Sequence, residues 1–218
     1  MSHSSTTRPT HSPKDVHALV PIADGTEEVE ATSIITVLRR AGCNVTVAST
    51  TPNLTVTGAR GAHLTADTTL TALRQPAGGW TVIALPGGKP GAEHFRDTPA
   101  LIQLLQSQRA AGRLIAAICA SPAIVLQAHG LLPPHRTGHP SFELKGGDGS
   151  GGSGSGSDRR DEGRVVYDKE WNTVTSLGPG SAIEFALFCV GLLCGDSKVT
   201  EVAQPMCLNF TPQPTAKL

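Results

Sequence analysis

Apolar residues follow two different periods along the chain, and the two periods alternate. Short runs without polar interruption predict strands that are buried on both faces, as in a parallel sheet. Stretches in which apolar residues recur every three or four positions predict helices. The predicted strands are 17–23, 44–48, 82–85, 114–118 and the hairpin pair 165–167 and 173–175, and the predicted helices are 29–41, 99–110, 123–129 and 181–193. Strands that alternate with helices predict an α/β fold whose mostly parallel sheet is covered by helices on both faces.

Turn-forming residues mark the ends of these elements. Gly42 and Gly112 directly follow two of the predicted helices, where glycine commonly ends a helix. Thr98 precedes Pro99 and is predicted to cap the helix that begins there. The segment 86–91 follows a strand and contains three glycines and two prolines, so it is predicted to be a turn with Lys89 in solvent.

The 218 residues are enough for one domain with polar ends. Residues 1–15 are polar and interrupted by proline, which predicts a disordered tail without the apolar core of a secretory signal. Residues 16–210 form the predicted domain, and residues 211–218 form a C-terminal tail. A Gly/Ser-rich run over 146–162 cannot bury apolar surface and is predicted to be a mobile surface loop inside the domain.

Charge and cysteine content narrow the possible partners. Lys and Arg number 18, as do Asp and Glu, so the formal net charge is zero and no global field indicates nucleic acid or an anionic membrane. No apolar run approaches the ~20 residues of a membrane span. The five cysteines are scattered and lack a C-x-x-C pair, so we expect no disulfide framework and no metal site. These features predict a cytoplasmic protein, with import directed by the N-terminal tail left open.

Cys119 is the candidate nucleophile. It follows the buried strand 114–118 and precedes two small residues and Pro122, a proline suited to the first turn of a helix. A strand, a sharp turn and a helix would lift the sulfur above the edge of the sheet. The helix N-terminus would favour the thiolate, so we expect the thiol pKa of Cys119 to lie below its usual range. The alternative is a buried cysteine that acts as a small apolar residue.

Other candidate residues follow neighbouring strands at the same sheet edge, where α/β proteins bind ligands. Glu30 lies beside the apolar positions of helix 29–41 and could face this edge, whereas Glu27 and Glu28 are expected to be first-turn acids that complement the helix dipole. The Gly87-Gly88 pair either forms a tight turn or exposes backbone N–H groups that bind an oxyanion. Cys43, Cys189 and Cys194 are interpreted as core residues rather than as partners of Cys119.

Five motifs occur together in the order and spacing of a known family. They are Glu27–Glu30, Leu85–Gly88, Ala116–Pro122, His139-Pro140, and Gly178–Gly180 followed by Glu184–Leu187. In these motifs the chain resembles the ThiJ/DJ-1/PfpI superfamily, most closely its DJ-1/YajL branch, from about residue 17 to about residue 206. The resemblance implies a flavodoxin-like three-layer sandwich and a homodimer.

The same resemblance implies roles for particular residues. Cys119 would be an oxidation-sensitive nucleophile, Glu30 would hydrogen-bond its sulfur, and His139 would lie nearby. Gly88 and Ala120 would supply backbone N–H donors, and Arg40 and Arg60 would be dimer contacts near the site. His139 also has a plain interpretation as a strand-end histidine bonded to the backbone.

At several positions the chain departs from related branches of the superfamily, and these departures argue against a protease and a glutamine amidotransferase. Ala120 stands where the protease branch has a histidine, so the Cys-His-acid triad of those proteases is not expected here. The flanking residues also depart from class I glutamine amidotransferases, which place glycine beside the nucleophile and use a His-x-Glu pair. The Gly/Ser-rich run after His139 is longer than is typical of the family.

The chemistry of a cysteine beside a carboxyl predicts an enzyme without a cofactor. A thiolate and a carboxylate in contact would repel, so the pair should share one proton, with Glu30 protonated and donating to the sulfur. Such a pair suits a glyoxalase III-type enzyme or deglycase acting on small 2-oxoaldehydes such as methylglyoxal, with a role in oxidative-stress protection. The alternative is a redox-sensing chaperone or binding protein. A third possibility, a role in thiazole-phosphate biosynthesis, lacks a G-x-G-x-x-G phosphate loop.

Overall fold

The structure is a computed structural model that describes residues 11–145 and 161–209. Most of the predicted Gly/Ser-rich loop 146–162, residues 1–10 of the predicted tail and all of the predicted C-terminal tail 211–218 lie outside the described residues. Within the described part of the segment 1–15, Pro13–Asp15 form a short 3-10 helix.

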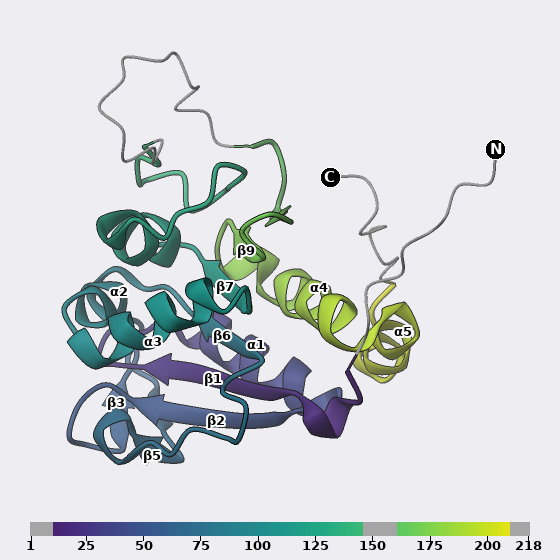
Figure 1. Cartoon of the computed structure of the whole chain (residues 1–218), viewed down its shortest axis with the longest axis horizontal. Helices are drawn as coiled ribbons and strands as arrows, with labels where there is room; N and C mark the ends of the chain where they lie inside the picture. Colours follow the sequence, from purple (N-terminus) through teal and green to yellow (C-terminus); the bar gives the residue numbers. More distant parts are fainter. Residues whose placement is uncertain (1–10, 146–160, 210–218) are drawn as a thin grey trace.

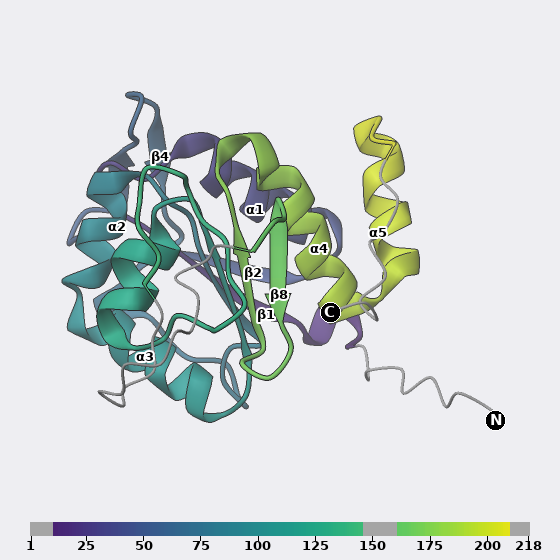
Figure 2. The ribbon, with the colours of Figure 1, turned by 90° about the horizontal axis from the view of Figure 1, so that it is seen from above.

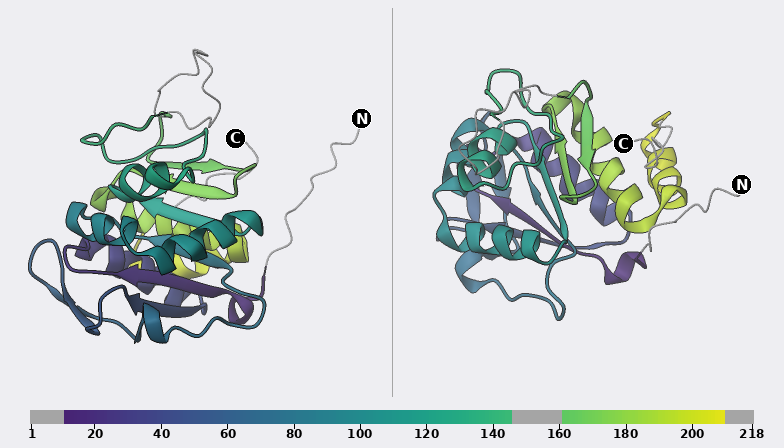
Figure 3. Two further views of the ribbon diagram at one scale, coloured as in Figure 1. Left: turned by 60° about the vertical axis from the view of Figure 1, so that its left-hand side comes forward. Right: turned by 45° about the horizontal axis from the view of Figure 1, so that its top comes forward.

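A seven-stranded sheet forms the centre of the molecule, with strand order β5-β2-β1-β6-β7-β9-β8. Its strands are β1 (His17–Ile22), β2 (Asn44–Ser49), β5 (Thr68–Thr69), β6 (Val82–Leu85), β7 (Leu114–Ile118), β8 (Val165–Asp168) and β9 (Thr173–Ser176). Every neighbouring pair is parallel except β8 and β9, which pair antiparallel at one edge. Two further views show this hairpin at the edge of the sheet (Figure 3). The predicted mostly parallel sheet is confirmed.

Helices cover both faces of the sheet (Figure 1). In the described part of the chain the α-helices are α1 (Glu28–Arg40), α2 (Lys89–Arg96), α3 (Pro99–Ala110), α4 (Ala182–Cys194) and α5 (Asp196–Ala203). Seen from above, the sheet runs between the pair α2 and α3 and the pair α1 and α4 (Figure 2). Helix α1 packs against α4 because its buried stripe includes Ile34, Val37 and Leu38. The arrangement is the predicted flavodoxin-like three-layer sandwich.

Several elements differ from the sequence-based prediction. Helix α2 begins at Lys89, so the predicted turn ends at Gly88 and Lys89 is an exposed residue of the first helical turn. Gly91 gave a turn signal, but it lies inside α2, and its lack of a side chain allows a close approach, since a Cβ there would come within 2.7 Å of the backbone nitrogen of Thr26. Thr98 does not cap α3 through its side chain, because its hydroxyl donates to the carbonyl of His94 at 2.6 Å.

Short elements escaped prediction because they lack a full hydrophobic period. The missed elements are α5, the two-residue strand β5 and an antiparallel hairpin of β3 (Thr55–Thr57) and β4 (His63–Thr65). The predicted helix 123–129 is a π-helix over Pro122–Leu126 followed by a 3-10 turn over Gln127–His129. In the ranges that the structure describes, no helix combines the length and apolar character needed to cross a membrane.

Candidate active site

The carboxyl ends of β1, β6 and β7 lie next to one another at one edge of the sheet. Strand β1 pairs with β2 on one side and with β6 on the other, so the chain reverses its direction of travel across the sheet between β1 and β6. Ligands of open α/β sheets bind outside the carboxyl ends of the strands at such a reversal. The loops after these three strands therefore carry the candidate site.

Cys119 lies in a sharp turn directly after β7. Its φ angle is 64°, in the left-handed region that non-glycine residues rarely occupy. The surrounding backbone holds this conformation, because its N–H donates to the carbonyl of Ser176 at 2.9 Å and its own carbonyl accepts from the N–H of His139 at 2.9 Å. The hydroxyl of Ser121 adds a bond to the carbonyl of Pro86 at 2.6 Å. The residue is 7% exposed, so the sulfur is held in one place with limited access to water.

Glu30 is fully buried in the first turn of α1. Its Oε2 accepts the backbone N–H of Gly87 at 2.6 Å, and its carboxyl forms a hydrogen bond with the Cys119 thiol. Glu27 caps the helix and accepts the N–H of Glu30 at 2.8 Å, as expected for an acid at this end of a helix. Helix α1 therefore brings one carboxyl group into direct contact with the sulfur on β7.

Burial and mutual contact set the protonation of this pair. Burial raises the pKa of Glu30 to about 7, although the hydrogen bond from Gly87 opposes the shift. Burial, the charge of Glu30 and the hydrogen bond to Glu30 raise the pKa of Cys119 to about 12, while the N–H groups of Gly88 and Ala120 lower it. Between these pH values the pair holds one proton, as the sequence predicts.

The proton is nevertheless not where the sequence places it. The expectation of a depressed thiol pKa at Cys119 is wrong, because it counted the helix N-terminus and neglected the burial of the sulfur beside a carboxylate. At pH values above about 7 the resting state is a thiol hydrogen-bonded to the Glu30 carboxylate. The carboxylate is then placed to remove the thiol proton when the sulfur attacks.

Glycines at two positions let the backbone approach the sulfur. A Cβ at Gly87 would lie 2.7 Å from Cβ of Cys119 and 2.8 Å from Oε2 of Glu30. Gly88 has a φ of +83°, and a Cβ there would collide with the carbonyl oxygen of Gly25. With these side chains absent, the N–H groups of Gly88 and Ala120 donate to the Cys119 sulfur. These N–H groups can therefore also serve an oxyanion formed beside the sulfur.

Gly178 marks the point where three candidate residues converge. A Cβ at this position would lie 3.4 Å from Cδ2 of His139, 3.8 Å from Sγ of Cys119 and 3.9 Å from Oε1 of Glu30. Sequence analysis included Gly178 in a motif and did not assign it to the site. The signal that could have assigned Gly178 to the site is its position directly after β9, whose carboxyl end lies beside that of β7. Gly178 keeps open the space that the nucleophile, the carboxyl group and the imidazole share.

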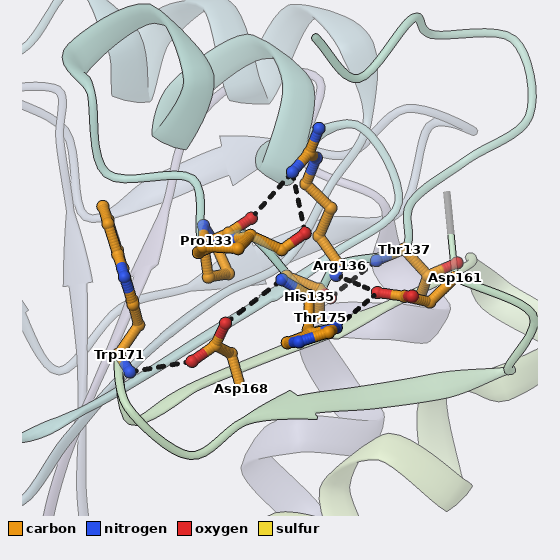
Figure 4. Close-up of polar contacts among 9 residues, drawn as sticks. Pro133, His135, Arg136, Thr137, Asp161, Asp168, Trp171 and Thr175 are labelled. Atoms are coloured by element: carbon orange, nitrogen blue, oxygen red, sulfur yellow. Dashed lines mark hydrogen bonds and ion pairs between the residues drawn. The ribbon is translucent and has the colours of Figure 1, made fainter. Parts of the chain in front are cut away.

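Hydrogen bonds from backbone N–H groups to side chains hold the segment 135–137, which leads to His139 (Figure 4). Asp161 accepts the N–H of Arg136 at 2.6 Å, and Asp168 accepts the N–H of His135 at 3.1 Å. The N–H of Thr137 then donates to the hydroxyl of Thr175 at 2.9 Å. These bonds fix the segment that leads to His139, whose own N–H reaches the carbonyl of Cys119. The histidine is thus attached to the turn that carries the nucleophile.

The hydrogen bond to the His139 ring assigns its tautomer. Nδ1 accepts the N–H of Ser141 at 3.2 Å. Nδ1 therefore carries no proton, and a neutral ring carries it on Nε2. The ring also packs edge-on against Phe142 with centroids 5.9 Å apart. A neutral His139 in this orientation can donate a hydrogen bond from Nε2 to an oxygen atom.

Glu28 has a different role from the one expected. It is 9% exposed, and its Oε1 accepts the N–H groups of Arg60 at 2.6 Å and Ala62 at 3.2 Å. Glu28 therefore holds the loop between β3 and β4 against the start of α1, and it is not merely a first-turn acid. The signal that sequence analysis missed was the β3–β4 hairpin itself.

The two arginines expected near the site lie at opposite ends of α1 within one chain. Both are exposed, and Arg60 lies in the β3–β4 loop held by Glu28. Arg40 is the last residue of α1, whereas Glu30 lies in the first turn. A helix rises about 1.5 Å per residue, so these two residues are about 15 Å apart along its axis.

In contrast, the structure brings together the other predicted site residues, which are Cys119, Glu30, His139, Gly88 and Ala120. Their contacts join the loops after β1, β6 and β7 to the segment that carries His139. Within the described ranges, no cluster of three or more His, Cys, Asp or Glu residues could hold a metal ion.

Known proteins share the sequence and the fold. Residues 16–191 match the DJ-1/PfpI family. Protein DJ-1 homolog A of Arabidopsis thaliana is 38% identical over 89% of this chain, which spans about half (47%) of that relative's length. Glutathione-independent glyoxalase DJR-1.2 of Caenorhabditis elegans is 35% identical over 89% of this chain and 97% of its own. The structure of oxidized Toxoplasma gondii DJ-1 is similar, with a TM-score of 0.79 and 41% identity over 89% of this chain and all of that one.

Proposed function

This chain belongs to the DJ-1/PfpI family, and we propose that it is a cofactor-independent cysteine enzyme that acts on small 2-oxoaldehydes as a glyoxalase III-type lyase or deglycase. The observation that carries the proposal is the buried pair of the Cys119 thiol and the Glu30 carboxyl group, which shares one proton between about pH 7 and about pH 12. A thiol and a base in contact supply both a nucleophile and a proton shuttle. A relative named as a glutathione-independent glyoxalase supports the same class of reaction.

The reaction begins with attack of the sulfur on an aldehyde. As the C–S bond forms, Glu30 takes the thiol proton, and the aldehyde oxygen becomes an oxyanion within reach of the Gly88 and Ala120 N–H groups. Return of a proton to this oxygen gives a hemithioacetal. No redox partner is needed, because the aldehyde is oxidised at the expense of the neighbouring ketone.

Proton transfer between the two carbons completes the internal redox step. The Glu30 carboxylate removes the proton from the former aldehyde carbon and returns it to the former ketone carbon. The Nε2–H of His139 donates to the ketone oxygen and stabilises the enediol that forms in between. The hydroxyl proton of the former aldehyde carbon passes to the former ketone oxygen as the enediol collapses, which gives a thioester. Water hydrolyses the thioester to a 2-hydroxy acid and frees the thiol.

Consumption of methylglyoxal without glutathione tests the proposal. Cys119→Ala should abolish turnover because the C–S bond cannot form, and Glu30→Gln should remove nearly all of it because an amide cannot shuttle protons. Cys207→Ala and Glu170→Gln are the matched controls, since both residues are exposed and lie outside the site. Full activity in Cys119→Ala would refute the mechanism.

Redox sensing is a second candidate function of the same sulfur. Cys189, Cys43, Cys194 and Cys207 lie on other elements, so the Cys119 sulfenic acid would have no adjacent thiol with which to form a disulfide. Peroxide would then oxidise it further to the sulfinic acid, and the Ala120 N–H could hydrogen-bond the new oxygens. Loss of turnover together with gain of binding to unfolded protein after oxidation would favour the chaperone form of this function.

We also propose a homodimer in which Arg40 and Arg60 are contact residues. This rests on their exposure and on family membership. Analytical ultracentrifugation tests it, with Arg40→Ala and Arg60→Ala expected to weaken association and Arg96→Ala as the control.

A further inference from the structure

Two cysteines meet at the edge of the sheet opposite the candidate active site. Helices α1 and α4 both begin at the carboxyl edge, near Glu30 and Gly178, and pack against each other on one face. Both therefore end at the amino edge of the strands. Cys43 lies between the end of α1 and the start of β2, and Cys194 is the last residue of α4. The parallel course of the two helices brings these residues together.

The two thiols are in contact. They form a hydrogen bond with each other, and both side chains pack against the same hydrophobic cluster. Cys43 is 7% exposed and Cys194 is half-buried, so the pair is reached from solvent on the Cys194 side. The interpretation of Cys194 as a simple core residue is therefore incomplete.

The N-terminal segment fixes the backbone on both sides of the pair. The N–H of His11 donates to the carbonyl of Leu193, next to Cys194, at 2.8 Å. The side-chain amide of Asn44, next to Cys43, donates to the carbonyl of Lys14 at 2.5 Å. One short segment thus bonds to the neighbour of each cysteine, which holds the two positions at a constant separation.

The two thiols have unequal electrostatic environments. The hydrogen bond from Cys43 and the nearby Lys198 ammonium lower the pKa of Cys194, against the effect of burial. The hydrogen bond to Cys194 and burial raise the pKa of Cys43. Lys198 also pairs with Glu201 at 2.5 Å, which keeps its ammonium in the first turns of α5. Cys194 is the more nucleophilic member, and Cys43 remains a thiol next to it.

We propose that Cys43 and Cys194 form a second redox site, in which a hydroperoxide converts the two thiols to a reversible intrachain disulfide. The Cys194 sulfur attacks the peroxide and its O–O bond breaks, which gives the Cys194 sulfenic acid and, for hydrogen peroxide, one water. The Cys43 sulfur then attacks the sulfenic sulfur, its S–H bond breaks, and a second water leaves. Two thiols are oxidised and one peroxide is reduced.

This site would respond to peroxide differently from Cys119. Cys119 has no thiol partner in its turn, whereas each member of the pair has the other within hydrogen-bond reach. The disulfide would join residues about 150 positions apart in the chain, a long loop whose closure is expected to stabilise the folded state. It would tie the ends of α1 and α4, whose first turns frame the candidate active site, and a thiol reductant would reverse it.

Peptide mapping of the full-length protein tests the proposal. The reduced protein is treated with hydrogen peroxide, remaining thiols are blocked with an alkylating reagent, and the digest is analysed without reduction. We expect a cross-linked peptide that joins Cys43 to Cys194, that dithiothreitol cleaves, and that accompanies a rise in Tm. Mixing isotope-labelled with unlabelled protein should give only cross-links within one chain.

Matched variants separate this site from the rest of the protein. Cys194→Ser and Cys43→Ser should each abolish both the cross-link and the rise in Tm. Cys194 is half-exposed, so its replacement by serine is expected to disturb folding less than that of the buried Cys43. Cys189→Ser, on the same helix but outside the pair, should keep both effects, and so should Cys119→Ser. The proposal is overturned if Cys43 and Cys194 remain alkylatable after Cys119 is fully oxidised, or if the cross-link uses another cysteine or joins two chains.

Discussion

The carboxylate of Glu30 is expected to suppress the thiolate of Cys119 and yet to be essential for turnover. The change Glu30→Gln tests both statements, because it removes the charge and keeps the shape of the side chain. The new amide oxygen can still accept the N–H of Gly87, which lies 2.6 Å from the carboxylate in the native protein. The variant therefore isolates the charge from the position of the helix.

The expected fall in the thiol pKa of Glu30→Gln follows from the contact between the Glu30 carboxylate and the Cys119 sulfur. Burial and Glu30 together raise the pKa of Cys119 from 9.0 to about 12. Two charges about 4 Å apart interact by about 4 kcal/mol at an effective dielectric constant of about 20, which equals about 3 pK units. Because burial is the largest cause of the rise, we assign the smaller share, about 1 pK unit, to Glu30. At about pH 9 the thiolate fraction of Cys119 should then rise about tenfold in Glu30→Gln.

The assay is the rate of iodoacetamide alkylation at Cys119 against pH, followed by peptide mass spectrometry so that other cysteines do not contribute. Methylglyoxal turnover is measured on the same samples, with Glu170→Gln as the control. We expect faster alkylation and lost turnover in Glu30→Gln, and because unfolding would also expose the thiol, the variant must keep the Tm and circular dichroism spectrum of wild type for the result to count. Equal or slower alkylation across the pH range would show that burial alone holds the thiol protonated. A wild-type midpoint well below the ordinary thiol value would refute the thiol resting state.

Three further predictions concern the same site. The pKa of Glu30 is about 7 when folded against an ordinary value of 4.5, so the folded state holds an extra proton between these values. The stability that this proton contributes is complete below the ordinary value, and about 3 kcal/mol is lost as the pH rises through the folded pKa. Urea denaturation should show this loss in wild type and not in Glu30→Gln, and parallel curves would contradict it. Gly178→Ala should reduce kcat/KM about tenfold with little change in Tm, because its methyl enters the shared space, whereas Gly180→Ala, with nothing within 4 Å, should be neutral. Excess peroxide should add two oxygens to Cys119, one from each of two equivalents, and abolish turnover, and mass spectrometry that finds Cys119 unmodified while turnover falls would rule this out.

The sequence by itself determined the sheet, most of the helices and the place of the site. Uninterrupted apolar runs such as 114–118 and periodic stretches such as 29–41 are local signals, and alternation of the two leaves few arrangements other than a parallel sheet between helices. The carboxyl ends of parallel strands share one edge, so residues that follow separate strands must gather there. For this reason the sequence places Cys119 and Glu30 at one edge of the sheet, and the resemblance to the DJ-1/PfpI family implies the contact between them.

Only the tertiary structure decided where the proton of that pair resides. A pKa depends on how completely distant segments exclude water and on which charges they bring into contact, and neither quantity is written in a local pattern. The helix N-terminus beside Cys119 was visible in the sequence, but the burial of the Cys119 sulfur next to Glu30 was not, and this burial is the largest effect on the thiol pKa.

The same limit applies to contacts between segments far apart in the chain. Cys43 and Cys194 carry no motif, and they meet because α1 and α4 run side by side to the same edge. Glu28 binds the backbone of the β3–β4 loop, a contact that depends on the pairing of β3 with β4 and that the sequence of α1 alone does not indicate. Periodicity specifies each element and the face that it buries, whereas the partners of a single side chain are set by the packing of all the elements together.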